Sequence, residues 1–122
     1  MSEKVTGIGG VFFRARSPEA LGAWYAEHLG VELEDFGGTT FTAADGDQTV
    51  WSPFAHDTAY FGDPGRQYMV NYRVRDLDAM LAQLRAAGAE VDERVEEHEY
   101  GRFGWATDPE GNRFELWEPP QS

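Results

Sequence analysis

The sequence predicts an α+β fold built from two βαβββ modules, and three observations support this. Two segments, 11–17 and 70–76, share the order apolar, any residue, aromatic, Arg, apolar, Arg, capping residue. A helical pattern follows each segment, and strand-like segments separated by turn residues follow each helix. Because a helix covers one face of each sheet, we expect cupped mixed sheets around a cleft, with helices on the outer faces.

The expected helices have clear start and stop signals. Ser17 and Pro18 suit the first turn of one helix, and Gly30 suits its end. Asp76 is the candidate N-cap of the second helix, and Gly88 follows it as the C′ residue. We expect apolar residues at helical spacing to face the sheets: Leu21, Trp24, Tyr25 and Leu29 in the first helix, and Leu77, Met80, Leu81 and Leu84 in the second.

Glycine, proline, asparagine and aspartate supply the turns between the expected strands. The expected strands after the helices are 31–36, 39–43 and 48–52 in the first half, then 91–100, 102–107 and 113–117. These elements predict a single domain over residues 1–122, with module 1 at about 5–54, a linker at about 55–67 and module 2 at about 68–120. A ferredoxin-like two-layer domain is the competing architecture.

Composition excludes several classes of function. The formal net charge of −12 would repel a phosphate backbone, so nucleic acid is not an expected partner. The chain has no cysteine, which removes disulfides, thiolate metal sites and cysteine nucleophiles. No apolar run is long enough to span a bilayer, and the first residues lack an apolar signal region, so we expect a cytoplasmic protein that does not bind membranes.

The end of the chain resembles a known family. Residues 108–119 read DPEGNRFELWEP, which is similar to the D-P-x-G-N-x-x-E-L hairpin that ends many members of the vicinal oxygen chelate superfamily. That superfamily includes glyoxalase I, extradiol dioxygenases, fosfomycin-resistance enzymes and bleomycin-resistance proteins. Residues 70–88 resemble the family's opening strand and helix. The resemblance implies paired βαβββ modules, commonly in homodimers, with a small-molecule site inside the cupped sheets.

In metal-dependent members of this superfamily, residues on the first and last strands of each module hold a divalent ion. The matching positions are Gly10, Thr49, Met69 and Glu115. Only Glu115 offers a typical ligand, because glycine has no ligand atom, a thioether suits soft metals and a lone hydroxyl is a poor ligand. A shift of one residue, to Val50, does not restore the site. We therefore expect no metal and no cofactor, with a divalent metal at Glu115 as the alternative.

Strand alternation sorts the residues of both opening strands into two faces. We expect one set of residues to face the helices: Val11, Phe13 and Ala15 in the first strand, and Val70, Tyr72 and Val74 in the second. The alternate residues should face the cleft: Gly10, Phe12 and Arg14 in the first strand, and Met69, Asn71 and Arg73 in the second. There the two arginines could donate to a carboxylate, phosphate or enolate oxygen, and Asn71 to a carbonyl. Alternatively, each arginine pairs internally with an acid such as Glu115.

Glu115 shares a strand face with Trp117 and is the candidate catalytic residue, as a general base that abstracts a proton next to a carbonyl. The alternative is a structural partner for Arg14 or Arg73. Aromatic side chains that could form stacking walls for a planar ligand are Phe12, Trp51, Tyr100, Trp105 and Trp117.

Two hypotheses follow. The first is a metal-independent small-molecule-binding protein that sequesters an aromatic or oxygen-rich metabolite or antibiotic and forms a homodimer. Bleomycin-resistance proteins, which lack the metal ligands and sequester a drug, resemble this case. The second is a lyase, isomerase or dioxygenase that uses Glu115 as a metal ligand or as a general base.

Overall fold

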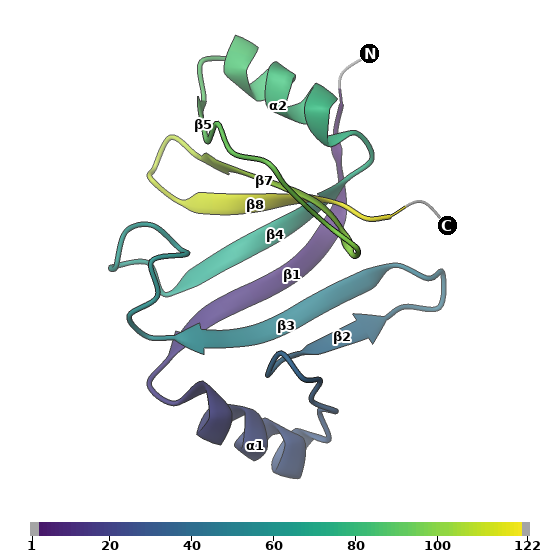
Figure 1. Ribbon diagram of the computed structural model, residues 1–122. Coiled ribbons are helices and arrows are strands. Elements are labelled where there is room, and N and C mark those ends of the chain that lie inside the picture. The colour runs from purple at the N-terminus through teal and green to yellow at the C-terminus, as the bar shows by residue number, and fades with distance from the viewer. Residues whose placement is uncertain (1–2, 121–122) are drawn as a thin grey trace. The chain divides into compact units, whose positions relative to one another are not determined.

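The computed structural model describes residues 3–120, which form two helices and eight strands (Figure 1). This α+β composition, with parallel and antiparallel strand pairs, confirms the predicted fold class. The Cα positions divide the chain into two compact units. We call residues 10–69 the central unit, and residues 3–9 with 70–120 the terminal unit. The start of the first strand therefore groups with the second half of the chain, outside the module 1 expected at about 5–54.

The central unit has strand order β2-β3-β1. Strand β3 pairs in parallel with β1, which continues from the terminal unit, and antiparallel with β2. The elements are β1 (Val5–Ala15), α1 (Pro18–Leu29), β2 (Thr39–Thr42) and β3 (Gln48–Ala55). Helix α1 packs on β3 through the ring of Tyr25, whose centroid lies 4.8 Å from that of Trp51.

Helix α1 begins and ends where the sequence predicts. The side chain of Ser17 accepts a hydrogen bond from the amide of Ala20, and Gly30 adopts a left-handed φ of 72°. The expectation that Trp24 lies in the core is wrong, because 52% of it is exposed. The helix packs on its neighbours through Gly22, which lies against Leu33, and through Tyr25, which contacts Trp51. Trp24 therefore lies outside the buried side of the helix.

The strand expected at 31–36 does not form. Its backbone makes turn contacts, with the amide of Glu34 donating to the carbonyl of Gly38 and the amide of Gly37 donating to that of Glu34. The hydroxyl of Thr39 also donates to the carbonyl of Glu32 at 2.7 Å. These bonds satisfy polar groups that a strand would have paired with a neighbour.

The terminal unit has strand order β4-β8-β7-β5, and β6 also pairs with β7. Strands β4 and β8 are parallel, and β7 is antiparallel to its neighbours β8, β5 and β6. The elements are β4 (Tyr68–Val74), α2 (Leu77–Ala86), β5 (Glu90–Val91), β6 (Glu96–His98), β7 (Gly101–Thr107) and β8 (Arg113–Glu118). The single strand expected at 91–100 is thus divided into the short β5 and β6.

Helix α2 covers one face of this sheet. The carboxylate of Asp76 caps it by accepting from the amide of Ala79 at 3.0 Å, and Gly88 follows the helix with a φ of 84°. Its buried residues pack with partners from β4 and β8 in a cluster of Val74, Leu77, Met80, Leu81 and Leu116. No helix within residues 3–120 is long and apolar enough to cross a membrane.

Candidate functional site

The sheet face of the terminal unit that points away from α2 carries most of the predicted polar site residues. Val74 and Leu116 pack under α2, so the residues that alternate with them point to the opposite face. This confirms the predicted facing of Tyr72 and Val74. The residues on the opposite face, which we call the open face, include Asn71, Arg73, Phe103, Trp105, Glu115 and Trp117.

Glu115 lies at the centre of the open face and is only 2% exposed. One carboxylate oxygen accepts from Asn71 Nδ2 at 2.6 Å, and the other accepts from Trp105 Nε1 at 3.0 Å. Strand register produces this arrangement, because Asn71 on β4 and Trp105 on β7 are the direct neighbours of Glu115 on β8. Hydrogen bonds from N–H groups stabilise the charged form of a buried carboxylate.

Trp105 is fully buried beneath two arginines. The guanidinium carbon of Arg94 lies 4.9 Å from the centroid of its ring, and that of Arg113 lies 5.7 Å away. Arg113 also forms an ion pair with Asp92 at 3.0 Å. These contacts fix the indole so that its N–H points at Glu115. Trp105 therefore supports the carboxylate rather than offering an open stacking wall.

The donor set around Glu115 does not fit a divalent metal ion. Within residues 3–120, no three His, Cys, Asp or Glu side chains gather closely enough to hold one. Both carboxylate oxygens already accept hydrogen bonds, and the indole N–H of Trp105 can only donate, so it would repel a cation placed beside Glu115.

A row of aromatic rings continues the open face, and we call His98, Tyr100, Phe103 and Trp117 the aromatic row. The rings of Phe103 and Trp117 are parallel within 2°, with centroids 6.1 Å apart, and His98 stacks on Tyr100 at 5.0 Å. The indole N–H of Trp117 donates to the carbonyl of Tyr100 at 2.8 Å. Tyr100 is 56% exposed and His98 is exposed as well, so these two rings form the accessible end of the row.

Sequence reasoning missed Phe103 and His98. Alternation from Trp105 would have placed Phe103 on the open face, and pairing of β6 with β7 places Glu96 directly beside it. His98 lies two residues further along the same face, and its Nε2 is 3.1 Å from a carboxylate oxygen of Glu96.

Arg73 also lies on the open face, beside Trp117 in the β4–β8 register. Its Nη1 donates to the carbonyl of Ile8 at 2.6 Å, which ties β4 to the first residues of β1. Gly9 allows β1 to approach this face closely, because a Cβ there would overlap Asn71 Oδ1 and lie 2.8 Å from a ring carbon of Trp117.

Three predicted binding residues, Phe12, Arg14 and Trp51, lie in the central unit. Trp51 faces α1 and contacts Tyr25, so it lies on the opposite side of its sheet from Phe12. Phe12 is buried in a cluster with Phe61 and Met69. Arg14 is 7% exposed and donates to backbone carbonyls, including that of Arg66 at 2.7 Å.

Thr49 and Val50, the two positions considered on β3, lie on opposite faces of the strand. Val50 is the register partner of Gly10, so Thr49 points to the other face of β3, where it lies beside Phe41. Met69 is buried among aromatic rings. Val50 shares the face of Gly10, and its aliphatic side chain offers no ligand atom.

A family model described as a glyoxalase-like domain matches residues 10–117. Among curated protein sequences, none matches the chain. The match spans the whole central unit and residues 70–117 of the terminal unit, which include most of the segment 108–119 that suggested the resemblance.

Solved structures share the fold at low sequence identity. Methylmalonyl-CoA epimerase from Mycobacterium tuberculosis is 22% identical, with a TM-score of 0.65 over 96% of this chain and 90% of its own. A variant of the Streptomyces coelicolor methylmalonyl-CoA epimerase, in complex with 2-nitronate-propionyl-CoA, is 17% identical, with a TM-score of 0.71 over 93% of this chain and 97% of its own. A Vibrio splendidus 12B01 protein, described as a glyoxalase/bleomycin resistance protein/dioxygenase superfamily member, is 14% identical, with a TM-score of 0.58 over 95% of this chain and 98% of its own.

These structural similarities agree with the resemblance drawn from residues 108–119, and the sequence match covers far more than half of the chain. The protein thus belongs to the family of glyoxalase-like domains.

Proposed function

We propose that this protein is a metal-independent small-molecule-binding member of the glyoxalase-like family. The observation that carries the proposal is the hydrogen bonding of Glu115, whose two carboxylate oxygens accept N–H groups from Asn71 and Trp105. A carboxylate held in this way is poorly arranged to coordinate a metal. This favours binding over metal-assisted catalysis.

We further propose that the ligand is an aromatic or oxygen-rich metabolite or antibiotic that stacks against the aromatic row. Tyr100 is exposed, and the parallel rings of Phe103 and Trp117 lie behind it on the same face. Aromatic side chains bind planar ligands by burying large areas against a defined ring face. The guanidinium of Arg73, on the same face, suits a carboxylate or an enolate oxygen. Sequestration of such a compound, by a homodimer in the cytoplasm, is the corresponding biological role.

A thermal-shift screen against a panel of aromatic metabolites and antibiotics tests this proposal. We expect at least one compound to raise the melting temperature in a concentration-dependent way, with equal effect in the presence and absence of EDTA. A panel without any such compound would contradict binding, and a shift that EDTA abolishes would contradict metal independence.

A matched pair of variants locates the site. For a compound found in the screen, Tyr100→Ala should weaken binding about tenfold, the equivalent of losing one aromatic contact of about 1.4 kcal/mol. Tyr68→Ala removes an equally exposed tyrosine from the central unit and should change the affinity less than twofold. Equal effects of the two variants would place the ligand away from the aromatic row.

A second candidate function is proton transfer next to a carbonyl group, with Glu115 as the general base. The structural likeness to methylmalonyl-CoA epimerases favours it, since one of those structures contains 2-nitronate-propionyl-CoA. Incubation with methylmalonyl-CoA in D₂O, followed by mass spectrometry, separates the two functions. Deuterium uptake that Glu115→Gln abolishes would favour the enzyme, whereas no uptake beyond the protein-free rate would favour the binding protein.

A further inference from the structure

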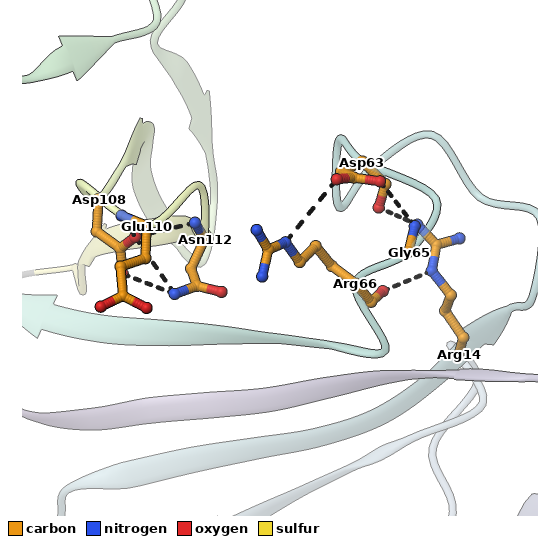
Figure 2. Close-up of polar contacts among 7 residues, drawn as sticks. All are labelled: Arg14, Asp63, Gly65, Arg66, Asp108, Glu110 and Asn112. Carbon is orange, nitrogen blue, oxygen red and sulfur yellow. Dashed lines mark hydrogen bonds and ion pairs between the residues drawn. The ribbon is translucent and has the colours of Figure 1, made fainter.

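The guanidinium of Arg14 is enclosed by backbone carbonyl groups from the segment between β3 and β4, residues 56–67. Figure 2 shows the Arg14 side chain directed at the turn that carries Asp63, Gly65 and Arg66. The carbonyl oxygens that accept from Arg14 belong to Arg66 at 2.7 Å, His56 and Thr58 at 2.8 Å each, and Asp63 at 3.3 Å. Four carbonyl dipoles from one irregular segment therefore converge on a single buried cation.

Two further contacts join Arg14 to the same segment. Its backbone amide donates to the carbonyl of Gln67 at 3.0 Å, and the side chain of Gln67 donates back to the carbonyl of Arg14 at 2.8 Å. The guanidinium carbon also lies 5.0 Å from the ring centroid of Phe61. Because a guanidinium is planar and carries five N–H donors, it can satisfy several carbonyls at once, which a lysine ammonium cannot do with the same geometry.

The segment places aromatic rings on the sheet face that points away from α1. Phe61 is almost fully buried against Phe12 and Met69, and its ring centroid lies 5.2 Å from that of Phe54. Tyr60 stacks on Phe54 at 5.5 Å. The face of the central unit that carries Gly10 and Phe12 is thus filled by residues of its own chain.

We infer that residues 56–67 act as a plug that closes this sheet face, and that Arg14 is the positioning residue that locks the plug in place. Gly10, Val50 and Met69, which lie at or beside the positions that hold a metal in related proteins, are in contact with packed aromatic rings. The plug therefore leaves no space for a metal ion beside these residues. The plug would then prevent a small molecule from binding on this face of the central unit. This inference does not depend on the proposed ligand, because it concerns the closure of the other unit.

Hydrogen exchange in Arg14→Ala tests the lock. The informative amides are those of Gly62 and Arg66, which donate to the carbonyls of Ala59 and Asp63 within the segment. We expect their exchange to become at least about tenfold faster, because the segment loses the cation that orders it. Amides of β7 and β8 in the terminal unit should keep their protection, and 8-anilinonaphthalene-1-sulfonate should bind the uncovered apolar face.

Chemical rescue distinguishes a specific role of the Arg14 guanidinium in holding the plug from a general loss of packing. Guanidinium chloride at about 20 mM, far below unfolding concentrations, should restore protection in Arg14→Ala by occupying the vacated space. Sodium chloride at the same concentration should not. Arg16→Ala removes an exposed arginine two residues along the chain and should leave the segment unchanged.

If Arg14→Ala does not fold, Arg14→Lys provides the test, since a lysine retains the charge and most of the side-chain bulk. Faster exchange at Gly62 and Arg66 in Arg14→Lys, without rescue by guanidinium, would support the lock. Wild-type protection of the segment in Arg14→Lys or in Arg14→Ala would overturn it. Rescue of Arg14→Ala by sodium chloride as effectively as by guanidinium would overturn it as well.

Discussion

The hydrogen bond between Asn71 and Glu115 offers a quantitative test of the site. Asn71→Leu keeps the approximate shape of the side chain but removes the donor that lies 2.6 Å from the carboxylate. Both residues are 2% exposed, so water does not readily replace the lost bond. A hydrogen bond to a charged group contributes about 1.5–3 kcal/mol, and we expect the free energy of unfolding to fall by about this amount.

Two further effects change the expected loss in free energy of unfolding. The variant also removes Asn71 Oδ1, which is buried without a hydrogen-bond partner among residues 3–120, and this offsets part of the loss. Glu115→Leu leaves two buried donors unpaired, at about 1–3 kcal/mol each. In the double variant neither partner of the Asn71–Glu115 bond remains, so the combined cost should fall short of the sum by about 1.5–3 kcal/mol.

Urea unfolding of the wild type, both single variants and the double variant measures this coupling energy. For a chain of this length, 1 kcal/mol corresponds to about 4 °C in melting temperature, so thermal unfolding provides an independent check. Glu93→Leu, at an exposed glutamate of the same unit, is the control and should change stability by less than about 0.5 kcal/mol. A coupling energy below about 0.5 kcal/mol would refute the buried bond.

Three smaller predictions concern packing and caps. Gly9→Ala should lower the free energy of unfolding in urea by about 1–3 kcal/mol, because its Cβ would meet Asn71 Oδ1 and the Trp117 ring. Gly65→Ala is the control, since a Cβ there meets only the Asp63 side chain. Equal losses of stability in the two variants would contradict this packing. Asp76→Ala should cost about 1 kcal/mol by removing the cap of α2, and an unchanged midpoint would show that the cap contributes nothing. Gly30→Ala should cost about 1 kcal/mol because of its left-handed φ, as measured by the thermal midpoint, and a stabilised variant would contradict that conformation.

Sequence patterns predicted the local features of the fold well. Ser17 and Asp76 cap their helices as expected, and the alternation of β4 separates the core face from the open face. These features depend on neighbours within a few residues, for which side-chain chemistry and strand or helix period are sufficient.

Features that depend on distant partners were predicted less well. Residues 31–36 have an acceptable strand pattern but find turn contacts instead of a neighbouring strand. Thr49 and Val50 differ by one residue, which places their side chains on opposite faces of the sheet, and only the pairing of β1 with β3 shows that Val50 is the partner of Gly10. Trp24 has the spacing of a core residue, yet contacts made by Gly22 and Tyr25 determine which side of α1 is buried.

The site itself was predicted only in part. Glu115 and Asn71 were both expected on one face, but their hydrogen bond joins residues 44 positions apart through the β4–β8 register, which a single sequence does not reveal. The partners of Arg14 could not be predicted for another reason. They are backbone carbonyls of an irregular segment, and every residue has a backbone carbonyl, so the sequence does not indicate which ones Arg14 contacts.

Metal stoichiometry is the most direct test of the central claim that Glu115 belongs to a metal-independent binding site. Protein purified without chelators, then dialysed against Mn²⁺, Co²⁺ or Zn²⁺, would be analysed by inductively coupled plasma mass spectrometry beside Glu115→Gln. We expect well under one ion per chain and no difference between the two proteins. One ion per chain that disappears in Glu115→Gln would contradict it.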